Sequence, residues 1–585
     1  MNLANMWVCD FETLTAADDR KSTYIWLFTA VNLGNMNCVY GSTMEEFIDF
    51  LQYTKGLKRC FFHNLKFDGE FITHHLLTNN YEYYPHQKDV PEHSFSILRS
   101  TQGAFYSMKI NFKYKAVEIW DSLKLLPAPV ERLAHDYKLD ICKLKIDYDT
   151  YRPYGYKAND SELQYGLNDV LIVAQVLRQY IMNGNTKMTV GGNAYARFLS
   201  TLTKAQKQMI SYDLSDGEDE YIRKAYQGGF CWVNPLHQNQ DIGCGLVYDN
   251  NSMHPSQLRY KPMPYGQPIP FTGEPDNPDY SLYVVRVNLT AKLKPNHIPC
   301  ISARKSFRFA DAEYIGEVNN LELVLTNLDL DLIYEQYDVS DTTEYLDGYY
   351  FTACTGLFNK FIDSVMEIKM KSTGAQRQFA KLDANNIYGK FGTNPRAESV
   401  EPYLVDGVVH YRKSDIESTP QKYYLPIAVF TTAYSRYQII TEAQKNYDRI
   451  LYCDTDSLHL IGYDLPELDI DDRRLGAWKL ENKFTRARFL RPKRYIEVYD
   501  TYQTAPEARI TVKQPSNRRK RTQLRLRDNK LILSHLEVKA GGMPNNVKQQ
   551  VTWDNFHTGT IYHGKLLPHH IQGGIVLKPH DFQLN

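Results

Sequence analysis

The sequence predicts a protein of several domains that combines α/β and α+β architecture. Strand-like and helix-like segments alternate up to about residue 187, which is typical of a layered α/β domain. Two short strand-like segments flank an acidic turn near residues 450–460, and a helical pattern at 359–390 precedes them. At 585 residues, the chain has the length of roughly four domains of ordinary size.

Composition excludes several classes of protein. A hydrophobic content of 43% with 23% charged residues is typical of a globular rather than a disordered chain. No run of 18 apolar residues and no secretory signal pattern is present, so neither a membrane span nor secretion is expected. Nine scattered cysteines without a Cys-x-x-Cys pair indicate a reducing cytosol rather than disulfides or a zinc site. The formal net charge is zero, so any polyanion must be bound by local basic patches.

The elements of the first domain follow from its pattern. Strands are expected at residues 6–11 and 60–63, and helices at 44–52 and 161–182. An α/β layer of this kind places residues at the ends of buried strands along one edge of the sheet.

Acidic residues recur at the edges of these elements. Asp10 and Glu12 occupy alternate positions of a strand, so both carboxylates point to the same face. Asp68 follows a second strand, and Asp169 lies four residues after Tyr165, on the same helical face. Four acids that converge could hold two metal ions about 3.5–4 Å apart for phosphodiester hydrolysis, with the tyrosine hydroxyl orienting water. Singly, each acid is better explained as a solvated surface residue.

Further elements are expected along the rest of the chain. A Pro-rich stretch at 262–278 followed by a strand at 282–289 indicates an inserted, loop-rich module. The helical pattern at 359–390 is broken by Gly374, then by Gly389 and Gly392. A polar, turn-rich piece occupies 394–422, strands resume over 425–500, and short strands make up the tail from about residue 530.

A second set of acids lies in this later part. Asp454 and Asp456 stand one residue apart in the turn between two strand-like segments, and Asp249 ends an earlier apolar strand. Carboxylates fixed in this way are the ligands that Mg²⁺ prefers, together with substrate phosphates. An ordinary Asp-Thr-Asp turn is the alternative explanation for the hairpin alone.

A basic stripe separates these acids in the sequence. Arg377, Lys381, Asn385 and Tyr388 fall at i, i+4, i+8 and i+11, which places them along one face of a helix. Cations beside a metal site are what a triphosphate needs, because they neutralise the charge on the leaving pyrophosphate. A solvated basic helix face is the alternative.

The order of these motifs resembles a family B DNA polymerase with a proofreading exonuclease, of the protein-primed phi-twenty-nine type found in small tailed bacteriophages. The resemblance spans nearly the whole chain. It rests on three nuclease motifs, a linking Tyr-Gln-Gly-Gly-Phe segment and four polymerase motifs, namely Asp10/Glu12, Asn64/Asp68, Tyr165/Asp169, 226–230, Asp249, 381–389, 452–457 and 493–495.

The resemblance implies a ribonuclease-H-like exonuclease domain followed by a right-hand polymerase of palm, fingers and thumb with two insertions. The implied boundaries are exonuclease 1–187, palm 188–260 and 425–530, insertion one 261–358, fingers 359–393, insertion two 394–424 and thumb 531–585. Insertion one would contact the priming protein and DNA. Insertion two would provide processivity and strand displacement.

Roles for single residues also follow from the resemblance. Asp10, Glu12, Asp68 and Asp169 would bind the metals of the 3′→5′ exonuclease, assisted by Tyr165 and Lys143. The single-stranded 3′ end would be held by Asn64, Phe67, Ser122 and Leu123.

In the polymerase half, Asp249 and Asp456 would bind the polymerisation metals with support from Asp454. Arg377 and Lys381 would contact the triphosphate. The nucleotide pocket would contain Asn385 and Tyr388, the primer end would meet Lys493 and Tyr495, and transfer of the primer between sites would involve Tyr226, Gly228 and Gly229.

One position departs from the family pattern. His254 stands where the family usually has a tyrosine that stacks beneath the incoming sugar and excludes a 2′-hydroxyl. Because an imidazole is flat but smaller, exclusion of ribonucleotides is expected to be weaker or built differently.

Basic residues interleave with aromatics near the end of the palm, as nucleic-acid contacts often do. The group consists of Arg486, Arg488, Arg491, Lys493 and Arg494 with Phe484, Phe489 and Tyr495. A second basic cluster at 518–527 favours a contact with the DNA backbone over a solvated loop.

The implied cofactor is Mg²⁺, replaceable by Mn²⁺, with two ions per active site. The implied ligands are primer-template DNA, single-stranded DNA, deoxynucleoside triphosphates and a terminal priming protein, bound by a monomer without a membrane in the cytoplasm of a bacterial host. The chain would replicate a linear phage genome. Alternatives are a linear-plasmid polymerase of the same family, an exonuclease whose polymerase half only binds DNA, and a replication scaffold without chemistry.

Overall fold

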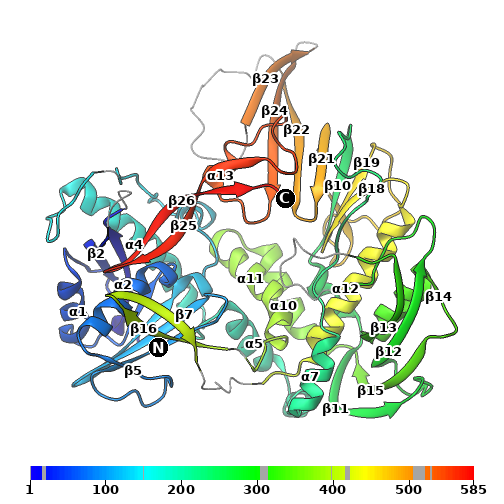
Figure 1. Ribbon diagram of the computed structural model, residues 1–585, viewed down its shortest axis with the longest axis horizontal. Helices are drawn as coiled ribbons and strands as arrows, with labels where there is room; N and C mark the ends of the chain where they lie inside the picture. The colour runs from blue at the N-terminus through cyan, green and yellow to red at the C-terminus, as the bar shows by residue number, and fades with distance from the viewer. Residues whose placement is uncertain are drawn as a thin grey trace.

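The computed structural model describes residues 2–15, 21–148, 150–302, 314–396, 398–414, 422–504, 521–527 and 530–585. Its N-terminal part is a sheet covered by helices, and its C-terminal strands reach back towards that part (Figure 1). Among the described residues, no helix combines the length and apolar character that crossing a bilayer requires.

The N-terminal domain is built on an eight-stranded sheet of order β3-β2-β1-β4-β8-β7-β6-β5. The strands are β1 Met6–Thr13, β2 Ile25–Asn32, β3 Cys38–Gly41, β4 Arg59–Phe62, β5 Glu82–Tyr83, β6 Ser94–Arg99, β7 Phe105–Phe112 and β8 Lys115–Asp121. The short helices η1 Leu3–Asn5 and η2 Ser122–Lys124 flank them. β1 pairs antiparallel with β2 and parallel with β4, so it lies within the sheet.

Successive residues of a strand point to opposite faces of the sheet, so apolar side chains on this sheet need cover on both sides. Helices cover both faces. On one face, Cys9 and Phe11 share a core with α1 Met44–Tyr53 and α2 Leu65–Thr78. On the other, Val8 shares a core with α3 Val130–Asp136 and α4 Asp160–Met182. Both faces of β1 are therefore buried, which fixes its register and the direction of its acids.

A five-stranded sheet of order β20-β10-β19-β18-β9 forms the centre of the remaining chain. Its strands are β9 Cys231–Val233, β10 Gly245–Asn250, β18 Ile450–Asp454, β19 Ser457–Ile461 and β20 Trp478–Phe484. Helices α8 Met253–Tyr260 and α12 Pro426–Lys445 accompany it. Residues 426–445 were expected to form strands. They form a helix buried along nearly its whole first half, where burial on every side overrides the strand preference of its β-branched residues.

The Pro-rich region is also more regular than the sequence predicts. β11 Met263–Thr272 lies at the edge of a sheet of order β11-β15-β12-β13, with β12 Leu282–Leu293, β13 Glu317–Thr326, β14 Tyr337–Val339, β15 Glu344–Cys354 and α9 Asn327–Gln336. An edge strand tolerates proline because one side of its backbone needs no partner. The register between β11 and β15 shifts between Tyr265 and Ile269, around Gly266.

A helical group packs beside the central sheet. It contains α5 Val190–Thr201, α6 Lys204–Met209, α7 Asp216–Lys224, α10 Asn359–Lys371 and α11 Gly374–Phe391. The helical pattern breaks at Ser372 and Thr373, next to the expected position, and Gly374 begins α11, whereas Gly389 lies inside α11 and does not break it. The rings of Phe198 and Phe358 stack at 4.4 Å between centroids and join α5 to the start of α10.

The turn-rich stretch after α11 contains an unexpected hairpin, β16 Val400–Val405 with β17 Val408–Lys413. Asp406 and Gly407 form its two-residue turn, both with positive φ, as type I′ turns require. The chain ends in a sheet of order β21-β22-β24-β23, a short helix and a long hairpin. These elements are β21 Arg486–Arg491, β22 Arg494–Thr504, β23 Arg521–Arg527, β24 Lys530–Ala540, α13 Asn545–Lys548, β25 Ile561–Ile571 and β26 Gly574–Gln583.

Candidate active sites

Four predicted acids form a first carboxylate site in the N-terminal domain, made of Asp10, Glu12, Asp68 and Asp169. They come from β1, α2 and α4. Burial and the charge of Asp169 raise the pKa of Asp10 to about 7. Burial and the charge of Asp10 raise the pKa of both Glu12 and Asp68, and burial raises the pKa of Asp169. These acids therefore share one crowded, poorly solvated region.

The first carboxylate site has the donor chemistry of a divalent cation site. Its oxygens are hard ligands, and Asp169 Oδ1 is buried without a hydrogen-bond partner. Its Oδ2 forms an ion pair with Lys143, so an ammonium group neutralises part of the acid charge. Across the described ranges, no three acidic, histidine or cysteine side chains already surround one point. Binding of metal would thus require the carboxylates to turn towards each other.

Tyr165 lies beside these acids, as its spacing from Asp169 predicts. The helix that carries both residues approaches β2 closely at Gly166, where an added Cβ would stand 3.0 Å from Thr29. Tyr165 OH and Tyr148 OH lie 2.6 Å apart and share a hydrogen bond. Sequence reasoning missed Tyr148, because it lies outside any regular pattern in the segment before α4.

The residues expected to bind single-stranded DNA also lie close together. Asp121 Oδ1 accepts hydrogen bonds from the Asn64 N–H (3.1 Å) and the Leu123 N–H (2.9 Å). Ser122 Oγ donates to the Phe62 carbonyl (3.0 Å). Asn64 caps α2 with a left-handed backbone, φ 92°, and is exposed. Phe67, one turn further, is half-buried against Phe71, so Asp121 organises a surface that the predicted residues share.

The second carboxylate site, Asp249, Asp454 and Asp456, lies on the central sheet. Asp249 of β10 pairs in register with Ser457 of β19, directly after the turn that holds Asp456 and follows Asp454 at the end of β18. Burial and the charge of Asp456 raise the pKa of Asp249 to about 7. Burial and the charge of Asp454 raise the pKa of Asp456 to about 6. The sequence prediction that these acids meet is therefore consistent with the fold, and their oxygens suit Mg²⁺.

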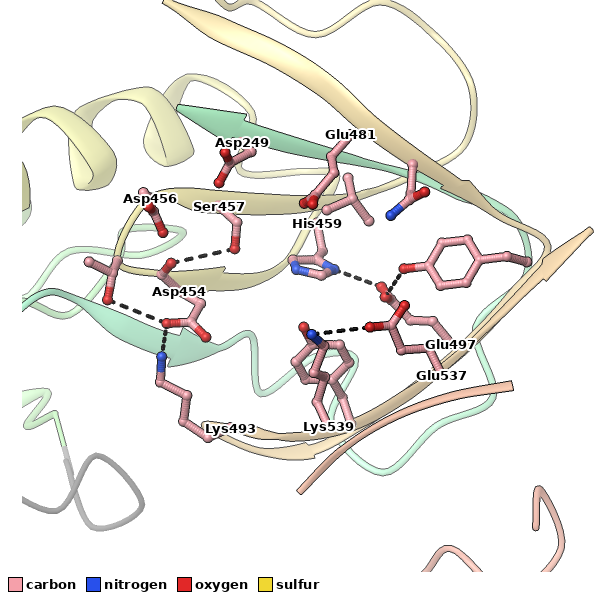
Figure 2. A pocket seen from close by; sticks show the side chains of 15 residues that line it. Asp249, Asp454, Asp456, Ser457, His459, Glu481, Lys493, Glu497, Glu537 and Lys539 are labelled. Atoms are coloured by element: carbon pink, nitrogen blue, oxygen red, sulfur yellow. Dashed lines mark hydrogen bonds and ion pairs between the residues drawn. The ribbon is translucent and has the colours of Figure 1, made fainter. Parts of the chain in front are cut away.

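These acids line a cavity of about 380 Å³. Figure 2 shows Asp249 on its strand beside Asp456 in the turn of the neighbouring hairpin, with Lys493 reaching Asp454 from the opposite side. Lys493 lies in the turn between β21 and β22 with φ 62° and forms an ion pair with Asp454. Its N–H donates to Tyr452 OH (3.0 Å), which in turn donates to Asp454 Oδ2 (3.1 Å). Tyr495 lines the same cavity.

The basic stripe of α11 faces this site, and α10 adds to it. The positive charges of Lys381 and Lys479 oppose the rise in the pKa of Asp249, so both lie near it. Lys369 of α10 donates to Ser252 Oγ (2.8 Å), and its pKa is lowered by burial and by Lys381 and Arg377. Sequence reasoning missed Lys369, because its neighbours come from a different helix of the hairpin.

His254 packs against the predicted nucleotide pocket. Its ring centroid lies 4.2 Å from that of Tyr388, and its Nδ1 is 2.8 Å from Ser435 Oγ of α12. Burial, with a smaller contribution from Arg436, lowers the pKa of His254 to about 4. The imidazole is therefore neutral and fixed in place. Asn385 is exposed on α11, one turn before Tyr388.

The linking segment 226–230 is fastened at two points. An added Cβ on Gly229 would stand 2.6 Å from the Thr455 side chain, so glycine is required for this close approach to the acidic turn. Arg436 donates from Nη1 to the carbonyls of Gln227 (2.9 Å) and Gly228 (3.1 Å). The other guanidinium nitrogens of Arg436 bind both carboxylate oxygens of Asp329 on α9.

Tyr226 also has a close neighbour, because an added Cβ on Gly392 would meet its hydroxyl at 2.6 Å. This contact places the start of the linking segment against the end of α11.

The predicted basic patch needs correction. Arg488 is buried and donates from Nη1 to the carbonyls of Trp553 (2.9 Å) and Phe556 (3.1 Å). Arg486 and Arg488 both pair with Asp241, and Arg486 stacks on the Trp553 ring at 3.7 Å. Both arginines join parts of the protein to each other, and the buried Arg488 is not available to a phosphate, whereas the Arg486 side chain is half-exposed. In the second cluster, residues 518–520 lie outside the described residues.

Known proteins match this arrangement over nearly its whole length. The family model described as DNA polymerase type B, organellar and viral, matches residues 52–157 and 145–474. The DNA polymerase of Bacillus phage M2 is 37% identical over 585 residues, covering 98% of each chain, and that of Bacillus phage phi29 is 36% identical, covering 99% of each.

Solved structures agree. Phi29 DNA polymerase in an orthorhombic crystal form aligns with a TM-score of 0.89 at 34% identity, covering 99% of this chain and 100% of that one. Phi29 DNA polymerase complexed with primer-template DNA and incoming nucleotides aligns with a TM-score of 0.87. The predicted fold class, an exonuclease domain followed by palm, fingers and thumb, is confirmed by this match. The chain belongs to the family B DNA polymerases of the phi29 type.

Proposed function

We propose that this DNA polymerase joins template-directed synthesis to 3′→5′ proofreading, starts on a terminal protein, and displaces the downstream strand while replicating a linear phage genome. The observation that carries the proposal is the second carboxylate site, which lies next to the basic residues of α10 and α11. Acids with cations close beside them match a reaction in which an alkoxide attacks a triphosphate.

At this site each residue has a separate role in nucleotidyl transfer. Lys381, Arg377 and Lys369 neutralise the triphosphate, so the pyrophosphate can leave without a large build-up of charge. His254 and Tyr388 form the wall for the sugar. Lys493, released from Asp454, is placed to contact the primer end.

Mg²⁺, or Mn²⁺ in its place, fits both sites, two ions at each. Asp249 and Asp456 would hold them at the polymerisation site with support from Asp454. The four acids of the first carboxylate site would hold them for proofreading. When bound, such ions activate the attacking oxygen and stabilise the charge on the leaving one. Lys143 pairs with Asp169 and Lys493 pairs with Asp454, so each lysine balances part of the acid charge at its site.

For proofreading, the single-stranded 3′ end would lie along Asn64, Phe67, Ser122 and Leu123. Asp121 fixes the backbone of this surface through two hydrogen bonds. Tyr165, with its hydroxyl held by Tyr148, would orient the attacking water. The linking segment at Tyr226, Gly228 and Gly229 would guide the primer between the two sites.

The proposed ligands agree with those named for the relatives. Phi29 polymerase has been solved with primer-template DNA, with single-stranded DNA and with incoming nucleotides. We propose the same ligands here, a monomer, and the cytoplasm of a bacterial host as the place of action. The terminal protein would dock on the module built by β11–β15 and α9, which has its own core.

One gel tests the proposal. A 5′-labelled primer on a template with a downstream blocking strand is incubated with protein and Mg²⁺, with and without deoxynucleotides. Full extension through the block, with shortening when nucleotides are omitted, is expected. Shortening alone would favour an exonuclease whose other half only binds DNA, and no change in either lane would contradict both activities. A plasmid-type enzyme would be distinguished by the terminal protein it accepts.

A further inference from the structure

We propose that Asp383 is a positioning residue of the polymerisation site: its buried ion pair with Arg197 holds the inner face of α11 against α5 and so sets where the basic stripe of that helix stands relative to Asp249. This role rests on the proposed polymerase function. Asp383 lies on the face of α11 opposite the stripe, and none of the predicted active-site roles uses it.

The two faces of α11 differ in character. Arg377, Lys381 and Asn385 of the stripe are exposed. Asp383 is two residues from both Lys381 and Asn385, which places it about 200° around the helix axis from each. It is the one charged side chain on a buried face that otherwise consists of Phe379, Ala380, Ala384, Ile387 and Phe391. Any shift of this inner face therefore moves the stripe on the outer face.

Arg197 of α5 provides the positive charge. Its Nη1 lies 3.2 Å from Asp383 Oδ2, and 1% of the Asp383 side chain is exposed. Its Nη2 donates to Asn185 Oδ1 at 2.9 Å. Asn185 is itself buried and donates from Nδ2 to the carbonyl of Tyr180 at 2.9 Å. The guanidinium that meets α11 is thus held by the segment that follows α4.

Three helices meet at this carboxylate. The start of α5 lies close beside α11, where an added Cβ on Gly191 would stand 3.5 Å from the carbonyl of Asn386, and the two helices share one core (Figure 1). Phe379, one turn before Asp383, packs against Tyr180 of α4 with 4.9 Å between the ring centroids. Asp383 therefore stands where α4, α5 and α11 join, and its ion pair acts on their relative positions.

The geometry of the pair favours a positioning role over a stabilising one. Neither oxygen of Asp383 accepts a hydrogen bond from a described residue, although the guanidinium nitrogen is close. A buried ion pair whose hydrogen bonds are incomplete contributes little net stability, because the loss of solvation offsets the attraction between the charges. What such a pair supplies is direction, since it favours one position of α11 on α5 over neighbouring ones.

The pair can also be removed by a proton. Burial raises the pKa of Asp383 from 3.8 to about 6, and the charge of Arg197 opposes this rise. Asp383 is thus ionised at pH 8 and largely protonated at pH 5.5. Because its pKa lies above that of an unfolded carboxyl, the fold favours the neutral form, and a neutral amide at this position should not unfold the protein at pH 8.

The other helices around α11 add no competing charge at this point. Burial raises the pKa of Tyr180 on α4, with a contribution from Asp383, and burial also raises the pKa of Tyr137 on α3, so both phenols are neutral. Helices α8, α10 and α12 bring apolar side chains and Tyr434 to the core shared with α11, and burial raises the pKa of Tyr434 too. Arg197 is therefore the charge that Asp383 meets.

The test compares Asp383→Asn, Arg197→Met and Arg197→Lys with Glu118→Gln as a control. Glu118 pairs with Arg59 between β4 and β8 of the N-terminal domain. KM and kcat for one deoxynucleotide are measured by single-nucleotide addition to a primer-template at pH 8 and pH 5.5. Thermal unfolding of each variant reports whether the fold is retained.

At pH 8 we expect Asp383→Asn and Arg197→Met to raise KM several-fold with kcat nearly unchanged. The reason is that a misplaced stripe weakens binding of the nucleotide in the ground state and the transition state alike. Arg197→Lys, which keeps the charge, and Glu118→Gln should keep the KM of the unmodified protein. The double variant Asp383→Asn with Arg197→Met should raise KM no more than the larger single change, since both act through one pair.

The pH dependence separates the charge from simple packing. The ratio of KM in Asp383→Asn to KM in the unmodified protein should fall towards one at pH 5.5, where Asp383 already carries a proton. Protonation of Asp249 and Asp456 affects both proteins alike and cancels in this ratio.

An unchanged KM in Asp383→Asn at pH 8 would overturn the positioning role, and so would a raised ratio that is the same at both pH values. If Asp383→Asn fails to fold, the two Arg197 variants decide, and equal KM values for Arg197→Met and Arg197→Lys would overturn the role. No extension by the unmodified protein would instead overturn the proposed polymerase, and this role with it.

Discussion

Lys493 forms an ion pair with Asp454 across the cavity that holds the second carboxylate site. The lysine comes from the turn between β21 and β22, whereas the acid comes from the hairpin of the central sheet. A parallel pair, Lys143 with Asp169, occurs at the first carboxylate site. At each site a lysine thus balances the charge of one acid.

Replacing Asp456 by alanine should abolish extension and spare degradation of single-stranded DNA. Asp456 lies in the second carboxylate site only, and a lost metal ligand should cost at least about 10²–10³-fold in extension rate. Exposed Asp448→Ala, just before the same hairpin, serves as the control. Extension by Asp456→Ala at the rate of the control would contradict the site assignment.

His254→Tyr should tighten discrimination against ribonucleotides. The imidazole is fixed between Tyr388 and Ser435 and is smaller than a phenol ring, which leaves more room beside the sugar. The ratio of kcat/KM for a deoxynucleotide to that for its ribonucleotide is the measurement. Ser435→Ala, which frees the imidazole, should lower the ratio further. Equal ratios in the unmodified protein and in His254→Tyr would contradict this role of position 254 in sugar discrimination.

Binding of Mg²⁺ should stabilise the protein more at pH 8 than at pH 5.5. The pKa values of Asp10 and Asp249, about 7, and of Asp456, about 6, lie above those of unfolded carboxyls. Between about pH 4 and 7 the folded metal-free protein therefore binds more protons than the unfolded chain, and its stability falls as pH rises.

Metal replaces those protons, so the gain in Tm on adding Mg²⁺ should grow over the same range. Thermal unfolding with Mg²⁺ or with chelator at each pH is the measurement. A gain that is equal at both pH values would count against cation binding by these acids. Asp249→Asn should reduce the pH dependence, since one of the raised carboxyls is then absent.

Lys369→Ala should weaken nucleotide use. Lys369 lies near Arg377 and Lys381 in the group that faces Asp249, so its loss removes one cation from the triphosphate. We expect kcat/KM for deoxynucleotides to fall roughly tenfold or more, the equivalent of about 1.4 kcal/mol. Lys371→Ala, an exposed position on the same helix paired with Glu367, is the control. Equal values for the two variants would exclude Lys369 from the site.

Sequence patterns predicted the contacts that arise within one strand or helix. They did not predict contacts between residues that are distant in the sequence. Asp10 and Glu12 share a face because of strand geometry, and Tyr165 meets Asp169 because of helix geometry. By contrast, Tyr148 and Lys369 reach their sites through contacts between distant segments. The spacing of residues in the sequence does not indicate such contacts. The helix at 426–445 was misread for a related reason. Its β-branched residues favour a strand in isolation, and only burial on all sides stabilises the helix.

Arg436 has a consequence for attempts to shorten this enzyme. Its guanidinium donates hydrogen bonds to Asp329 of α9 and to the carbonyls of the linking segment. Excising residues 261–358 would remove the carboxylate and leave a buried cation beside Gln227 and Gly228. A minimal version of the enzyme should therefore combine the deletion with a neutral side chain at position 436, chosen to donate to the same carbonyls. Glutamine keeps that donor without the charge.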